Sequence, residues 1–139
     1  MKITLTITAR TTDADGTQES STTVQGFWHR DETSVELRYR EPGGEESLGN
    51  TFTQLRIFDN RLELQRTGDY RCLLILETGA THTCSYITPF GPFPLTVTKQ
   101  AFHAALSPDG HGTLSVCYTL EAGSESTVHE LRLQVQPFQ

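Results

Sequence analysis

Few side chains in this sequence have the types and the spacing that chemistry requires. His82 and Cys84 lie two positions apart, so on a strand they would share a face. They could begin a zinc site if another ligand converged on them, the candidates being Cys72, His103 and His129. Neither the spacing nor the strand context matches a structural zinc motif. We therefore expect buried thiols and a hydrogen-bonded imidazole here, with no metal and no cofactor.

Signatures of catalysis are equally scarce. His129 and Glu130 are neighbours whose side chains would point to opposite faces of a strand, which argues against a direct acid–base pair. The chain contains no Gly-x-Ser-x-Gly elbow, Walker loop, dinucleotide fingerprint or His-Glu-x-x-His helix. These absences exclude common enzyme classes. A protein that binds or interacts is favoured over an enzyme, although a fold alone does not exclude chemistry.

The elements that must position these residues are short β-strands. Apolar and polar residues alternate in five blocks, at residues 3–7, 35–39, 62–64, 114–120 and 131–135. Such alternation buries one face of a strand and leaves the other in water. With the turn signals between them, the pattern predicts about ten strands, at residues 2–9, 18–28, 34–40, 48–58, 61–66, 70–76, 81–87, from 95 onward, between 110 and 121, and 127–136.

Two segments have residue patterns that a simple strand would not explain. Three prolines within residues 88–94 are expected to break regular pairing, because proline cannot donate to a ladder. Residues 99–106 contain good helix formers, with Phe102 and Leu106 four positions apart, yet they can also continue a strand. We favour the strand, because hairpin connections flank the segment on both sides.

Length, charge and cysteines narrow the class of protein. A chain of 139 residues is the size of one domain, which we assign to residues 1–139. Its 17 acidic and 11 basic side chains, with no basic cluster, argue against a nucleic-acid partner. Three cysteines inside predicted strands, and no export leader at the start of the chain, favour reduced buried thiols in the cytoplasm. No apolar run approaches the roughly 20 residues that span a bilayer.

The expected fold class is all-β. Connections of two to five residues suit antiparallel hairpins and are too short for parallel crossovers. A meander of this size either closes into a barrel or splits into two packed sheets, because an open sheet exposes its edges. We favour a single antiparallel meander barrel of about 8–10 strands. A sandwich is the alternative, although its Greek-key topology needs longer connections.

Several short motifs resemble a known family. They stand in order at residues 23–28, 66–68 and 77–80, at Tyr86, and at residues 89–91. In sequence and spacing they look like the YwiB-like family of small bacterial proteins, over nearly the whole chain. The resemblance implies a calycin-like barrel, similar in shape to lipocalins and fatty-acid-binding proteins, with no established biochemical function.

Gly26 and Trp28 also look like the Gly-x-Trp of lipocalins, in which an arginine of the last strand packs on the indole. Arg132 would be that arginine here. The pattern differs from the lipocalin one because it lies on the second predicted strand instead of the first. We favour a simpler interpretation, in which Gly26 is a bend or bulge and Trp28 belongs to the core.

A barrel offers two kinds of function. The first is binding of a small ligand, apolar or acidic, in the interior. Arg66 continues the alternation of Leu62 and Leu64 and could present its charge to an acidic ligand at a barrel mouth; the alternative is an exposed arginine at a strand end. The tyrosines could line a cavity or simply pack, and packing is favoured for most of them. The candidate ligand-binding residues are Trp28, Tyr39, Arg66, Tyr70, Tyr86 and Phe90.

The second kind of function is a protein-interaction or scaffold module that uses the loop 88–94 or a strand edge. Phe90 and Phe93 lie in this proline-rich loop and either form an exposed apolar patch or cap one end of the barrel. A protein partner or a homo-oligomer is compatible with this second function. No membrane partner is expected.

Overall fold

The computed structural model describes residues 1–41 and 50–138, which form ten β-strands and, within these ranges, no helix. The strands follow one another along the chain as β1 (Lys2–Asp13), β2 (Gly16–Arg30), β3 (Val35–Arg40), β4 (Thr51–Ile57), β5 (Arg61–Gly68), β6 (Cys72–Glu77), β7 (His82–Thr88), β8 (Gly91–Leu106), β9 (Gly112–Ala122) and β10 (Glu125–Pro137). The expected turn at residues 42–44, and the expected start of the fourth strand at Leu48, lie outside the described residues.

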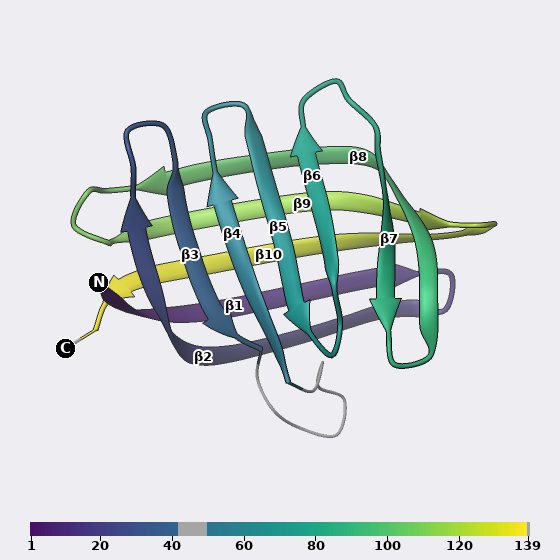
Figure 1. The fold of residues 1–139 in the computed structure, drawn as a ribbon, viewed down its shortest axis with the longest axis horizontal. Coiled ribbons are helices and arrows are strands. Elements are labelled where there is room, and N and C mark those ends of the chain that lie inside the picture. The colour runs from purple at the N-terminus through teal and green to yellow at the C-terminus, as the bar shows by residue number, and fades with distance from the viewer. Residues whose placement is uncertain (42–49, 139) are drawn as a thin grey trace.

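The strands form one antiparallel meander that is nearly closed. The hydrogen-bonded order is β6-β5-β4-β3-β2-β1-β10-β9-β8-β7, so the first and last strands of the chain pair in the middle (Figure 1). The two ends of this order, β6 and β7, meet through a single bridge between Arg71 and Ile87. The expected all-β meander barrel is confirmed.

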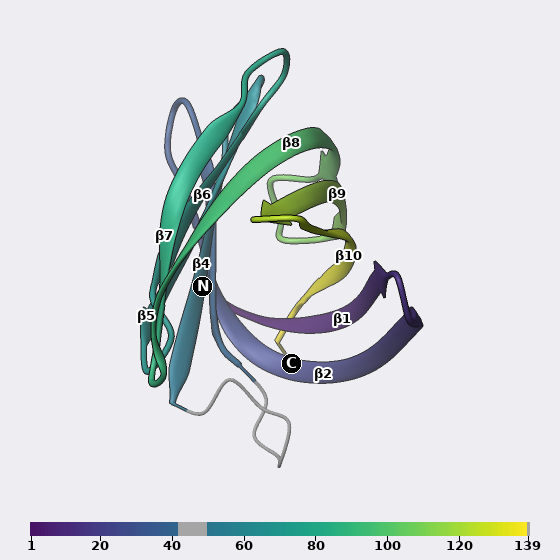
Figure 2. The ribbon, with the colours of Figure 1, turned by 90° about the vertical axis from the view of Figure 1, so that its right-hand side faces the viewer.

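Two long strands turn the corners of the barrel, which Figure 2 shows from its side. Strand β2 pairs with β1 as far as Phe27 and with β3 from Gly26 onward, and β8 passes from β7 to β9 through a register shift between Val97 and Lys99. At Gly26 a Cβ atom would lie 2.5 Å from the carbonyl oxygen of Arg38. Gly26 therefore allows a close backbone approach at the corner, in a regular part of the ladder rather than in a bulge.

One half of the interior is built from leucines that stand side by side. Leu37, Leu55, Leu64 and Leu74 are opposite one another on β3, β4, β5 and β6, and all are at most 3% exposed. Trp28 lies opposite Leu37 and is also buried. We call these four leucines, with the buried apolar side chains around them, the leucine core. Complete burial of such side chains contributes about 1.5–3 kcal/mol each.

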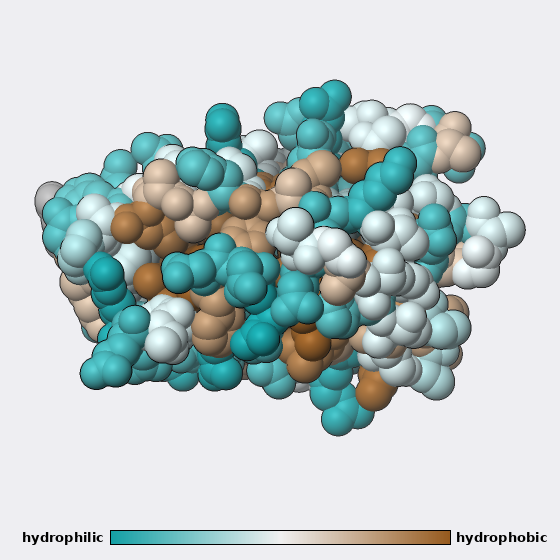
Figure 3. Space-filling view, turned by 90° about the horizontal axis from the view of Figure 1, so that it is seen from above, coloured by the Kyte–Doolittle hydropathy of each residue, from teal (hydrophilic) through white to brown (hydrophobic). Residues whose placement is uncertain are grey.

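The hairpin turns at the upper end of this half surround an open depression. It has a volume of about 470 Å³ and lies between the β2–β3 turn, the β4–β5 turn and the second half of β8. Seen from above, apolar side chains show between hydrophilic ones at this end of the molecule (Figure 3). Val35, Phe58, Phe102 and Leu106 are among the lining residues.

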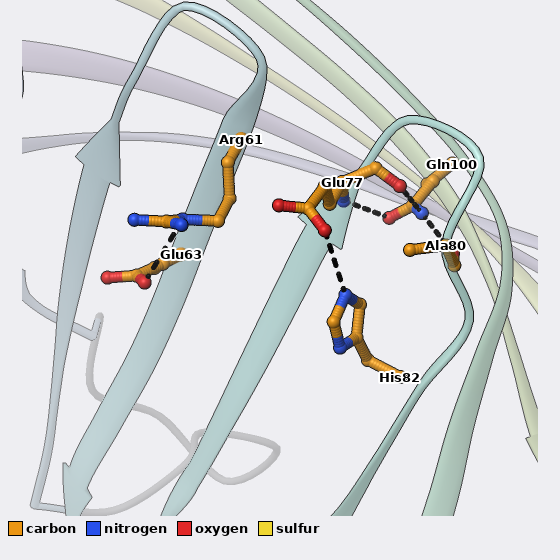
Figure 4. Close-up of polar contacts among 6 residues, drawn as sticks. All are labelled: Arg61, Glu63, Glu77, Ala80, His82 and Gln100. Atoms are coloured by element: carbon orange, nitrogen blue, oxygen red, sulfur yellow. Dashed lines mark hydrogen bonds and ion pairs between the residues drawn. The ribbon is translucent and has the colours of Figure 1, made fainter.

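A glutamine side chain completes the seam between β6 and β7. The side-chain amide of Gln100 donates to the carbonyl oxygens of Glu77 and Ala80, and its Oε1 accepts from the Glu77 N–H at 2.7 Å (Figure 4). At the other end of the seam, Arg71 and Ile87 exchange two backbone hydrogen bonds of 2.9 Å. Gln100 thus supplies from a side chain the donor and acceptor that a neighbouring strand would supply.

The proline-rich segment is more regular than expected. The interruption expected over residues 88–94 is wrong, because β8 begins at Gly91 and pairs Pro92 with Ile87 and Pro94 with Ser85. The Ile87 backbone bonds to Arg71 on its other side, so the pairs made by the two prolines are the non-hydrogen-bonded ones of the ladder. At these positions β7 would accept no hydrogen bond from β8, so the lack of an N–H in proline leaves no bond unmade. Residues 99–106 form a strand, as favoured.

Candidate functional site

Polar side chains gather in the other half of the interior, where Arg66 follows Leu62 and Leu64 on the inward face of β5. It stands opposite Thr53 of β4 and Cys72 of β6. Its side chain is 23% exposed, so it is not the exposed strand-end arginine that was the alternative. The alternation of β5 carries a guanidinium into the barrel because the same face that buries leucine at one end presents arginine at the other.

The guanidinium has two polar neighbours. Its Nη1 donates to the hydroxyl of Tyr86 at 3.3 Å. Its Nε lies 3.8 Å from Oε1 of Glu41, which is an ion-pair distance but too long for a hydrogen bond. Glu41 itself accepts a hydrogen bond from the Thr53 hydroxyl. The Nε atom is buried and has no hydrogen-bond acceptor among the described residues.

All four tyrosines of the chain belong to this region. Tyr70 and Tyr86 meet edge to face with ring centroids 6.0 Å apart. Tyr39 and Tyr118 are buried, and Tyr118 stacks on the ring of His129 at 5.1 Å. We call Arg66, Glu41 and the four tyrosines the arginine–tyrosine cluster.

Burial and charge shift the ionisation of the cluster. Burial raises the pKa of Tyr39, Tyr86 and Tyr118, and the nearby Arg66 charge opposes the rise in each. Burial alone would lower the pKa of Arg66, but Tyr118, Tyr86 and Glu41 outweigh it and raise that pKa. At neutral pH the tyrosines are therefore neutral donors and acceptors, while the guanidinium is charged. The Arg66 guanidinium can therefore donate to an acceptor oxygen or pair with an anion.

A histidine and two cysteines border the cluster. The ring nitrogens of His129 contact the hydroxyls of Thr11 and Thr127, at 3.5 and 2.8 Å. Burial, and then the Arg66 charge, lower the pKa of His129, so its imidazole is neutral at pH 7. Burial raises the pKa of Cys72 and Cys84. These thiols are therefore protonated and poor nucleophiles.

The structure brings together four of the six predicted ligand residues. Tyr39, Arg66, Tyr70 and Tyr86 lie in the cluster, whereas Trp28 lies in the leucine core. Phe90 is 87% exposed at the tip of the β7–β8 hairpin, outside the interior. It does not cap the barrel.

Three further residues differ from what the sequence patterns suggested, two of them because side chains alternate between the two faces of a strand. Arg132 is exposed on the outward face of β10, beside Thr8 and Ser115, so it is not the partner of Trp28 that the lipocalin-like pattern would require, and Trp28 is a core residue, as favoured. Cys117 was expected to be buried but is exposed, because it lies between the inward residues Val116 and Tyr118. His82 makes no hydrogen bond through its buried Nε2 within the described part of the chain, and this atom lies 3.8 Å from Glu77 Oε1 (Figure 4).

Sequence reasoning missed two members of the region. Glu41 stands at the start of a proline–glycine turn and was assigned to that turn, although it continues the inward alternation of Leu37 and Tyr39. Phe93 was expected in an irregular loop, but it lies opposite Tyr86 on the inward face and is 49% exposed. The alternation of Phe93 with Leu95 and Val97 was the signal that could have placed it.

Within residues 1–41 and 50–138, no three His, Cys, Asp or Glu side chains are arranged to hold a metal ion. That part of the chain also contains no helix long and apolar enough to cross a membrane.

The chain belongs to a family described as a domain of unknown function (DUF1934), whose model matches residues 3–135. The fold is that of a YwiB-like barrel. The crystal structure of the ywiB protein from Bacillus subtilis superposes with a TM-score of 0.84 at 20% sequence identity, over 99% of this chain and 92% of that one. No protein of curated function matches the sequence.

Proposed function

We propose that this barrel binds a small ligand in its interior and holds an anionic group of that ligand at Arg66. The observation that carries the proposal is the buried Nε of Arg66, which belongs to the arginine–tyrosine cluster and has no hydrogen-bond acceptor among the described residues. A buried donor without a partner costs about 1–3 kcal/mol. A ligand oxygen at this position would remove that cost and add a charge-assisted hydrogen bond.

Glu41 makes the proposal sharper. Its carboxylate lies beside the same Nε, so an anionic ligand must compete with it for the guanidinium. Neutralising Glu41 should therefore strengthen the binding of an anion and weaken that of a cation. A purely structural ion pair predicts no such opposite response.

Native mass spectrometry of the freshly purified protein tests the proposal. We expect a retained small molecule in the wild type and in Arg132→Gln, an exposed arginine that serves as the control. The double variant Arg66→Met with Glu41→Gln, which leaves no unpaired charge, should lose it. A wild-type protein without any retained molecule, or equal retention by the double variant, contradicts the proposal.

A second candidate is a non-enzymatic interaction module that uses the β7–β8 hairpin. It is favoured by Phe90, a large apolar side chain that is 87% exposed at the hairpin tip. Phe90→Ser should then abolish co-purification of a protein partner and leave the melting temperature unchanged. If Phe90→Ser lowers the melting temperature by several degrees, the residue is structural and this candidate fails.

A cytoplasmic location is part of the proposal. It is supported by the three cysteines, all of which are free thiols in the structure. Free thiols are typical of reducing compartments.

A further inference from the structure

The outer face of the barrel carries a groove behind the arginine–tyrosine cluster, and Tyr39 and Thr53 contribute to the lining of the groove as well. It has a volume of about 440 Å³ and crosses the strands β2, β3, β4 and β5. Among its lining residues are Gln25, Phe27, Arg38, Arg40, Phe52 and Gln54. We call it the Arg–Phe groove.

The register of the strands sets arginines and phenylalanines in alternation across this groove. Phe27 of β2 is opposite Arg38 of β3, and Arg40 of β3 is opposite Phe52 of β4. In each pair the guanidinium carbon lies 5.9 Å from the centroid of the phenyl ring. The two rings are nonetheless 50% and 49% exposed, which is a large apolar area for a surface strand.

The groove is positively charged in a protein whose formal net charge is −6. No carboxylate is among the described residues that line it. Glu36 lies 3.6 Å from the Nε of Arg38, and Arg40 makes no ion pair with any other described residue. An anion would therefore find two arginines on one face of one strand, with Cα atoms about 7 Å apart, and little competition from the described carboxylates.

We propose that the Arg–Phe groove is a binding site for a small aromatic anion, a ring that bears a carboxylate or phosphate. Arg38 and Arg40 would hold the anionic group, because guanidinium matches these groups in a bidentate geometry. The ring would cover the exposed faces of Phe27 and Phe52, and the amides of Gln25 and Gln54 would bind further polar atoms. The groove volume is within the range of small-molecule sites.

The surroundings argue against a long polyanion. On β3 the next outward position beyond the groove is Glu36, and the residues beside it across the sheet are Arg56 of β4 and then Glu63 of β5. A nucleic acid or a strongly acidic peptide that extended in this direction would leave the two arginines of the groove and meet charges of both signs, since Glu63 pairs with Arg56. The site therefore suits one compact anionic group with an apolar ring.

Titration of the protein with phenyl phosphate, followed by ¹H–¹⁵N NMR, tests the proposal. We expect saturable shifts at Phe27, Arg38, Arg40 and Phe52, with a Kd of about 1 mM or tighter. The double variant Arg38→Gln with Arg40→Gln should bind at least about tenfold more weakly. Arg10→Gln, which changes an exposed arginine on the outer face of β1, is the matched control and should bind as the wild type does.

Three outcomes would overturn the proposal. The first is the absence of saturable shifts up to about 10 mM phenyl phosphate. The second is equal binding of inorganic phosphate, which would show that the rings do not take part. The third is shifts confined to the arginine–tyrosine cluster. The double variant Arg66→Met with Glu41→Gln keeps this test independent of the interior ligand, because it should leave binding in the groove unchanged.

Discussion

The two halves of the barrel interior are built by the same strands and have opposite character. Strand β5 presents Leu62 and Leu64 to one half and Arg66 to the other, and β9 presents Leu114 and Val116 before Tyr118. The change from apolar to polar thus occurs along each strand and at a common level of the barrel. The leucine core can hold the fold together, which frees the arginine–tyrosine cluster to carry buried groups that cost stability.

The largest expected effect separates the two halves by stability. Leu64→Ala removes a side chain that is 1% exposed between Leu55 and Leu74, and should lower the free energy of unfolding by about 2–5 kcal/mol. Leu73→Ala, a half-exposed leucine on the outward face of β6, is the control and should cost less than about 1 kcal/mol. Urea denaturation measures both. Equal losses would show that the leucine core is not the main source of stability.

The next largest effect concerns the ion pair in the arginine–tyrosine cluster. Arg66→Met leaves the poorly exposed carboxylate of Glu41 without its cation and should cost about 2–3 kcal/mol. Adding Glu41→Gln should restore most of this loss, because the amide still accepts from Thr53 and carries no charge. A double-mutant cycle by denaturation measures the coupling. Strictly additive losses would mean that the two charges do not interact.

A smaller effect concerns the seam between β6 and β7, the two ends of the strand order. Gln100→Ala removes the side-chain hydrogen bonds to Glu77 and Ala80 and should cost about 1–2 kcal/mol. Amide hydrogen exchange at Glu77 should accelerate, since its N–H loses its acceptor, while exchange in the β1–β10 ladder stays slow. Unchanged exchange at Glu77 would show that Gln100 does not hold the seam.

The smallest effect is a pH dependence. The pKa of His129 is lowered in the folded protein, so the unfolded chain binds more protons around pH 6. Stability should therefore fall as the pH is lowered through about 6.5, the pKa of an unperturbed histidine. Urea midpoints measured from pH 8 to 5 should show this fall, and His129→Gln should reduce it. The same slope in both proteins would assign the effect to other groups.

The sequence predicted the architecture better than it predicted the members of the arginine–tyrosine cluster. Alternation and turn residues were enough for ten antiparallel strands and for the inward direction of Arg66, because both follow from local geometry. Cys117 could have been placed correctly from the same alternation. Glu41 could have been placed in the same way, since it follows Leu37 and Tyr39, but its pairing with Arg66 depends on the register of β3 and β5 on either side of β4. Pro92 and Pro94 were misjudged because their place in the ladder depends on which edge of β7 bonds to Arg71.

The central claim is that the arginine–tyrosine cluster holds a ligand through Arg66. The most direct measurement is the ¹H–¹⁵N signal of the Arg66 Nε–H group in protein as purified and in protein unfolded, dialysed and refolded to remove bound molecules. The account predicts that this signal moves on removal of the ligand while that of the exposed Arg132 stays in place. Identical Arg66 signals in the two samples would contradict it.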